Sequence, residues 1–394
     1  MNKPLAIVML TLMTTFIGFG IIIPVMPELI KRVDSEALAL HTGLLLSIYS
    51  AVSFVMSPLW GALSDRIGRR PIILIGILGF AASFLIFGLG AHNLTMMYIS
   101  RVLGGLFSGA VTSVIVAYVA DVTTPEERTK GMGLVGMSIG LGFTIGPGVG
   151  GLLSQVSLET PFFAASGLAL LTFFLAWSQL KESLAPERRR QATEARPSRW
   201  TAFQGSLRYL YLLALFVALS LAGLEATLQL FGMERFEVTP GQVGMMFFVC
   251  GLVGALVQGG VVRRYIRPGD EPKFIVAGLI FSASGFLLLL TSHSLWTATV
   301  YLSIFGIGNA LIRPCVTSLI TQKTTLGQGV ASGLSSSMDS LGRIIGPLGG
   351  ALLFGINLQL PYVVGGLLCL GALLLLVRFI TLDRQRTGSE ALHR

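Results

Sequence analysis

Apolar runs of about 20 residues recur along the whole chain, separated by short polar segments. Each run is long enough to cross a bilayer as an α-helix, whereas a membrane β-barrel would show alternating segments of about ten residues. The first run continues past Pro24 without a small-residue cleavage site, so it is predicted to be a membrane span and not a signal peptide. The pattern predicts an all-α polytopic membrane protein with twelve transmembrane helices at residues 5–27, 42–63, 72–90, 96–120, 131–154, 161–180, 209–231, 241–262, 273–291, 296–320, 329–355 and 361–380.

The longest polar stretch divides these helices into two sets of six, and the two sets resemble each other. The segment GFTIGPGVGGLL from Gly142 corresponds to GRIIGPLGGALL from Gly342, and both lie in the fifth helix of their half, so the repeat is parallel. Two parallel, pseudo-symmetric six-helix bundles are typical of alternating-access transporters, which bind substrate between the halves near mid-depth. The predicted parts are an N-terminal bundle, a cytoplasmic linker, a C-terminal bundle and a cytoplasmic tail, at residues 1–180, 181–208, 209–382 and 383–394.

Composition and charge support a membrane protein and exclude a nucleic-acid partner. Hydrophobic residues make up 53% of the chain and charged residues 12%, about half the share usual in soluble proteins. The net charge is +9, and most of the Lys and Arg residues lie in alternate segments between the spans. By the positive-inside rule these segments face the cytoplasm, which predicts a multi-pass protein of the cell membrane with both termini inside. We expect a monomer in the lipid bilayer.

The short matches to enzyme motifs in this chain lie in the wrong structural context for those motifs. GMGLVG at 131–136 and GMSIG at 136–140 match short dinucleotide and nucleophile patterns, but neither follows a strand as those sites require. The sequence has no GxxxxGK[ST] motif of a self-contained ATP motor. The three cysteines lie inside apolar runs without metal-ligand spacing. We therefore expect no catalytic residues, no metal and no cofactor.

Glu225 is the principal candidate for proton coupling. It lies in the outer half of the seventh predicted helix, where a carboxylate is costly and burial favours its protonated form. It would hold a proton and also attract cationic substrates; the alternative is a neutral structural acid. Asp339 and Arg343 lie four apart on the eleventh helix, so they form either an internal ion pair or a second coupling and substrate site that opens when a proton or substrate competes.

Other polar and aromatic positions within the spans are candidates for substrate contact. Arg101 either keeps its charge solvated by extending to the membrane surface or faces the cavity beside an acid. Arg313 is predicted to bond carbonyl groups freed by Pro314. Aromatic faces attract lipophilic cations and amides bond polar groups, although packing is the alternative for each. The candidates of this kind are Tyr49, Phe143, Gln229 and Asn309.

The segment GALSDRIGRRP at 61–71 gathers both signs of charge into one turn. Simple membrane anchoring accounts for Arg70, but it leaves the acid and the glycines unexplained, and Arg66 is included in the expected gating motif. We expect Gly61 to permit a close helix approach, Gly68 to form the turn, and Asp65 to lie at the N-terminus of the helix that starts near residue 330. Arg69 is expected to reach Asp121, which would make the segment a gating latch.

This segment fits the signature G-x-L-x-D-R-x-G-R-R of the major facilitator superfamily. GFGIIIPVMP at 18–27, RVLGGLFSGA from Arg101 and GFTIGPGVGG from Gly142 resemble motifs of its 12-helix drug:proton antiporter branch, and the second half is similar to multidrug exporters of the Bmr and NorA type. The resemblance implies an antiporter motif formed by Gly142, Gly146, Pro147 and Gly150.

The chain departs from these exporters at one position. Where they tend to carry an acid three residues before Arg-Pro, it has Ala310, and it carries Asp339 instead. The function expected is proton-coupled export of amphipathic, cationic drugs by alternating access. The alternatives are an exporter of a defined metabolite, such as a sugar or amino acid, and a transporter-like sensor that moves no substrate.

Overall fold

Long helices make up the structure, a computed structural model that describes residues 3–124, 127–184, 203, 205–267, 269–324 and 328–392. Most of the predicted linker, residues 185–202, lies outside these residues. The helices are α1 (Lys3–Val33), α2 (Leu38–Ile67), α3 (Arg69–Leu89), α4 (Leu94–Val122), α5 (Arg128–Leu153), α6 (Thr160–Gln179), α7 (Leu207–Phe236), α8 (Pro240–Leu256), the π-helix η3 (Val257–Val262), α9 (Arg263–Tyr265), α10 (Glu271–Leu290), α11 (Leu295–Lys323), α12 (Gln328–Ile356) and α13 (Leu360–Leu392).

These elements confirm the predicted all-helical membrane fold. In the described part of the chain, eleven helical spans are long and apolar enough to cross a membrane, and α8, η3 and α9 together form one of them. The helix α12 is not among the eleven, but it coincides with the twelfth predicted span. It contains Asp339 and Arg343 together with several serines and glycines, which lower its hydropathy. The helix α13 runs to Leu392, into the segment predicted as a tail.

Local signals in the sequence explain where several helices begin and end. The Asn93 side chain accepts hydrogen bonds from the backbone N–H groups of Thr95 and Met96 at the start of α4. Ser294 and Thr297 form a reciprocal capping box at the start of α11. Gly68 has φ of 110° between α2 and α3, a conformation that side chains disfavour, so the turn predicted there is confirmed.

The chain divides into two units, which are described separately. The first comprises Met1–Ala195 with Glu237–Phe248, and α1 lies against α5 within it. Glycines on α5 make this approach possible, since a Cβ on Gly146 would lie 2.7 Å from the Ile17 carbonyl oxygen and one on Gly150 would lie 2.5 Å from that of Ile21. The close packing expected of this glycine-rich helix is therefore present.

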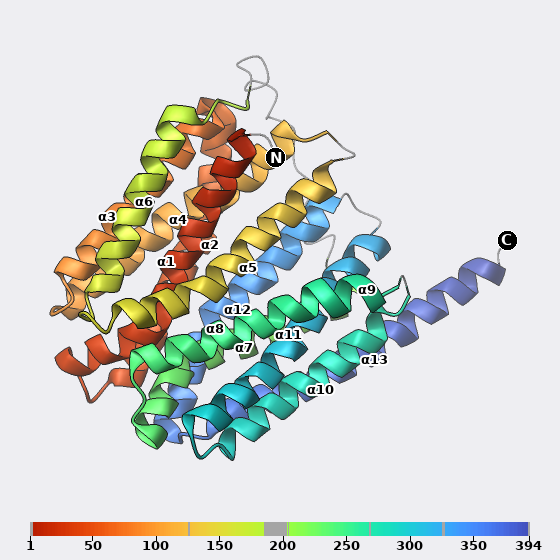
Figure 1. The fold of residues 1–394 in the computed structure, drawn as a ribbon. Coiled ribbons are helices and arrows are strands. Elements are labelled where there is room, and N and C mark those ends of the chain that lie inside the picture. The colour runs from red at the N-terminus through yellow and green to blue at the C-terminus, as the bar shows by residue number, and fades with distance from the viewer. Residues whose placement is uncertain are drawn as a thin grey trace. The chain divides into compact units, whose positions relative to one another are not determined.

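The second unit comprises Arg196–Phe236 with Val249–Arg394 and repeats this packing between α7 and α12 (Figure 1). A Cβ on Gly346 would lie 2.7 Å from the Leu219 carbonyl oxygen, and one on Gly350 would lie 3.1 Å from the Gly223 backbone. The sequence repeat thus corresponds to the same helix contact in both units. It also places α7 and α12, which contain the candidate acids, side by side.

Candidate functional site

Glu225 on α7 forms an ion pair with Arg343 on α12. Their side-chain atoms Oε2 and Nη1 are 3.3 Å apart, and Glu225 is only 8% exposed. Both residues lie near the middle of helices long enough to span a membrane, where an uncompensated charge would cost several kcal/mol. Each charge therefore compensates the other across the close contact of α7 and α12.

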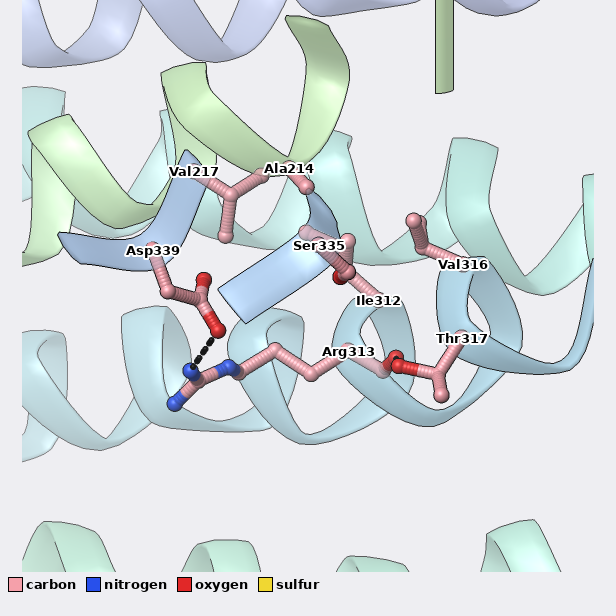
Figure 2. A pocket seen from close by; sticks show the side chains of 8 residues that line it. All are labelled: Ala214, Val217, Ile312, Arg313, Val316, Thr317, Ser335 and Asp339. Carbon is pink, nitrogen blue, oxygen red and sulfur yellow. Dashed lines mark hydrogen bonds and ion pairs between the residues drawn. The ribbon is translucent and has the colours of Figure 1, made fainter. Parts of the chain in front are cut away.

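A second ion pair joins α11 to α12. Arg313 Nη2 lies 3.1 Å from Asp339 Oδ2, and the two side chains are 43% and 36% exposed (Figure 2). The sequence predicted that Arg313 bonds backbone carbonyls near Pro314, but its guanidinium donates to this carboxylate instead. Asp339 thus has a partner on a neighbouring helix, and the internal pair expected with Arg343 is replaced by two pairs between helices.

Two buried amides lie one helical turn from these pairs. Gln229 follows Glu225 by four residues on α7, and Asn309 precedes Arg313 by four on α11. The polar side-chain atoms of both amides have no hydrogen-bond partner within the described residues. Buried amides of this kind are normally bonded, so these two retain hydrogen-bonding capacity for another group.

An aromatic cluster occupies the first unit. Phe19 on α1 contacts both predicted aromatics, with ring centroids 5.3 Å from Tyr49 on α2 and 5.5 Å from Phe143 on α5. Phe16 adds a fourth ring, 5.1 Å from Phe143. Sequence reasoning missed Phe16 and Phe19, although both flank the glycine of the first-helix motif. The cluster joins three helices with faces that can attract a lipophilic cation.

Arg101 lies inside the first unit and not at the membrane surface. It is 1% exposed, which rules out the first of the two alternatives, the extension to the membrane surface. Its guanidinium carbon lies 5.5, 5.2 and 4.9 Å from the ring centroids of Tyr49, Phe84 and Phe87. Nε and Nη2 have no hydrogen-bond partner within the described part of the chain. The three rings stabilise the cation where the sequence suggested a nearby acid.

The charged turn after α2 forms a compact network. Arg69 lies 2.6 Å from Asp65 and 3.0 Å from Asp121, so the predicted contact with the end of α4 is present. Arg66 is exposed. Within the described residues, a Cβ on Gly61 would meet no atom within 4 Å, so the close approach predicted for this glycine is not observed.

Sequence reasoning missed a further acid in this network. Glu182, just after α6, accepts hydrogen bonds from the backbone N–H groups of Arg69 and Arg70 at 2.8 and 3.1 Å. The next residue, Ser183, donates to Asp121 at 3.1 Å. A carboxylate at the first turn of α3 satisfies unpaired N–H groups and complements the helix dipole. The start of the predicted linker therefore stabilises the turn.

Membrane-length helices, an internal repeat and ion pairs inside apolar helices are the features of a polytopic membrane transporter. The sequence matches the family model of the Major Facilitator Superfamily over residues 8–328 and 267–393. The chain belongs to this superfamily, and it is a transporter and not an enzyme. The described residues contain no group of three or more His, Cys, Asp or Glu that could hold a metal ion.

Several characterised relatives cover nearly the whole chain. Multidrug resistance protein 1 of Bacillus subtilis (strain 168) is 33% identical over 370 residues, 92% of each chain. Quinolone resistance protein NorA of Staphylococcus aureus (strain MSSA476) is 28% identical over 382 residues, 96% of this chain and 97% of NorA.

Solved structures share the fold. The human organic anion transporter MFSD10 (TETRAN) has a TM-score of 0.71 at 25% identity, over 95% of this chain and 99% of that one. A bacterial homologue of the human lysosomal transporter Spinster, in an inward-facing and occupied conformation, has a TM-score of 0.69 over 96% of both chains. Its identity of 16% shows likeness of fold alone.

Proposed function

We propose that this transporter exports amphipathic, cationic drugs in exchange for protons by alternating access. It would act as a monomer in the cell membrane with both termini in the cytoplasm. The observation that carries the proposal is the ion pair between Glu225 and Arg343 inside apolar helices. An acid inside a membrane-spanning helix is a functional-site candidate by default, because burying a carboxylate there is costly and evolution rarely retains one that has no role.

Proton exchange follows from the charge of Glu225. When Glu225 is ionised, its carboxylate in the second unit attracts a cationic drug. When Glu225 binds a proton, it no longer offsets the positive charge of Arg343, and the added positive charge disfavours the drug. Proton and drug then bind in alternation, and each shifts the conformational equilibrium through its different affinity for the two states.

The aromatic cluster of Phe16, Phe19, Tyr49 and Phe143 supports a lipophilic substrate. Gln229 and Asn309 are the proposed hydrogen-bonding contacts. The names of the two bacterial relatives, multidrug and quinolone resistance proteins, support drugs over a single sugar or amino acid. No observation favours a sensor that moves nothing.

The turn around Arg69 is the proposed gating element. Its ion pairs connect the ends of α2, α3 and α4, and Glu182 adds the segment after α6. Opening this end of the unit would require these contacts to break together.

Arg101 supports a second candidate, the transport of organic anions. Its charge is buried among rings, and two of its nitrogens lack hydrogen-bond partners within the described residues. MFSD10, which has the same fold, is named an organic anion transporter. A carboxylate substrate would satisfy these donors.

The test is efflux from reconstituted vesicles driven by a pH gradient. Ethidium serves as the cationic dye, an anionic dye tests the second candidate, and labelled sugars and amino acids test a metabolite exporter. We expect Glu225→Gln to abolish gradient-driven ethidium efflux, whereas Glu234→Gln, an exposed acid near the end of the same helix, should leave it intact. Unchanged efflux by Glu225→Gln would refute the proton role of Glu225.

A further inference from the structure

A pocket lies inside the second unit, where α7, α11 and α12 meet (Figure 2). One part of its lining is apolar and the other contains an ion pair and two hydroxyl groups. Its apolar residues are Ala214, Val217, Ile312 and Val316, and its polar residues are Arg313, Thr317, Ser335 and Asp339.

In the ion pair that lines this pocket, Asp339 can exchange Arg313 for another cation. The side chains of Arg313 and Asp339 are 43% and 36% exposed, against 18% and 10% for Arg343 and Glu225. An exposed pair is less constrained by its surroundings and can change partners, whereas a buried pair is held because separation leaves a desolvated charge. Of the two carboxylates in these ion pairs, Glu225 and Asp339, Asp339 is therefore the one that another cation can reach.

We infer that this pocket is a subsite for a substrate ammonium group, which replaces Arg313 as the partner of Asp339. The inference rests on the proposed function and names the part of the substrate that this unit binds. An ammonium group has three N–H donors, and the hydroxyls of Ser335 and Thr317 supply acceptors beside the carboxylate. The apolar wall from α7 and α11 packs against the adjoining methylene groups.

The position of Asp339 also links this subsite to the proton site. Asp339 and Arg343 lie four apart on α12 and therefore on one face. While Glu225 is ionised it attracts Arg343, and Asp339 stays accessible to the substrate. When Glu225 binds a proton, it no longer offsets the positive charge of Arg343, which lies one helical turn from Asp339 and then repels the ammonium group. Proton and substrate thus exclude each other although they bind different carboxylates.

Few other charged groups bear on this exchange. Around Glu225, Arg343 projects from α12 and Arg313 from α11, and the Cys250 thiol lies on α8. From α13, Tyr362 packs against α7 at Phe231. The α7 residues that line the pocket, Ala214 and Val217, carry no charge. Among the described residues, Arg343 and Arg313 are therefore the basic groups that act on these two acids, and Arg343 is the one paired with Glu225.

Equilibrium binding to the purified full-length protein in nanodiscs tests the inference. The probe is dansylcadaverine, which carries a primary ammonium group, and its control is the uncharged N-acetyl derivative. We expect Asp339→Asn to weaken dansylcadaverine binding about tenfold or more and to leave the acetyl derivative unaffected. Arg313→Gln should tighten dansylcadaverine binding, because the competing cation is gone.

A lysine within the pocket provides a variant that leaves Asp339 in place. Ser335 lies four residues before Asp339 on α12, so Ser335→Lys brings its own ammonium group to the carboxylate. It should block dansylcadaverine, whereas the uncharged Ser335→Met should block it less. Equal loss in both variants, or wild-type affinity in Asp339→Asn, would overturn the subsite.

The link to Glu225 is tested by a second-site variant. Glu225→Gln mimics the protonated acid, so it should weaken dansylcadaverine binding at every pH. Glu225→Gln/Arg343→Gln removes the positive charge of Arg343 as well and should restore binding without pH dependence. Equal affinities in the single and double variants would overturn the exchange. Transport by the wild type in the vesicle assay decides the proposed function separately, since these titrations involve no transport.

Discussion

Arg101 bears its positive charge in the interior of the first unit, where three aromatic rings surround it. Cation–π contacts of this kind contribute about 0.5–2 kcal/mol each, depending on desolvation. Two guanidinium nitrogens nevertheless lack hydrogen-bond partners within the described residues, and such buried donors cost about 1–3 kcal/mol each. These two contributions are similar in size, so the cost of several kcal/mol for desolvating the buried charge decides the balance in favour of an uncharged side chain of similar length.

We expect Arg101→Met to raise thermal stability by roughly 1–3 kcal/mol, since the unsatisfied donors are removed and the rings still pack against a long side chain. Tryptophan fluorescence during heating in detergent measures the change. Arg101→Lys, which keeps the charge, should show no such gain. A lower melting temperature for Arg101→Met would mean that the rings outweigh the missing hydrogen bonds.

At the scale of elements, Glu182 stabilises the first turn of α3 by accepting two backbone hydrogen bonds. We expect Glu182→Ala to destabilise this turn by about 1 kcal/mol. Hydrogen–deuterium exchange should then speed up at the amides of Arg69 and Arg70. Glu127 provides the control, because it also precedes a helix but its side chain caps nothing. Equal protection of α3 in Glu182→Ala would contradict the assignment.

The contact between α1 and α5 depends on glycines that face the α1 backbone. A Cβ on Gly146 would lie 2.7 Å from the Ile17 carbonyl oxygen and 2.9 Å from the Gly20 Cα, and neither backbone atom can yield without moving the helix. We expect Gly146→Leu to lower stability by about 3 kcal/mol or more, as overpacking does. Gly140, whose Cβ would meet no atom within 4 Å in the described structure, provides the control. Thermal unfolding in detergent should separate the two leucine variants.

At the scale of the whole molecule, the sequence predicts those features that depend on neighbouring residues along the chain, namely the helices and the glycine-mediated contacts. Hydropathy located the helices, and the repeated glycine segment predicted matching helix contacts, because both signals depend only on residues that are consecutive in the sequence. Partner choice between helices was not predictable in this way. Spacing suggested that Asp339 would pair with Arg343, but the packing of α12 against α7 and α11 provides each with a different partner.

Glu182 and Arg101 also have contacts that could not be predicted from their neighbours in the sequence. Glu182 looked like one charge of a solvated linker, because nothing in its neighbourhood indicates the distant helix start that it caps. Arg101 lies near the end of its predicted span, which suggested solvent access, and only the rings of α2 and α3 reveal its burial. In both cases the deciding contacts come from residues far away in the sequence.

The ion pairs of α12 also bear on how the chain is made. An acid and a base near the middle of a helix each oppose membrane insertion by about 2.5–3.5 kcal/mol. Both partners, Glu225 and Arg313, precede α12 in the chain and therefore emerge from the ribosome first. The nascent helix thus meets its counter-charges already in place.

We expect α12 to insert poorly when synthesised alone and efficiently when the segment from α7 to α11 precedes it. Glycosylation mapping during translation into microsomes measures the difference. Asp339→Leu/Arg343→Leu should let the isolated helix insert, and full insertion of the unaltered isolated helix would contradict the expectation. The charges proposed to move protons and drugs would then also impose an order of assembly, in which α12 joins the bilayer only after its ion-pair partners.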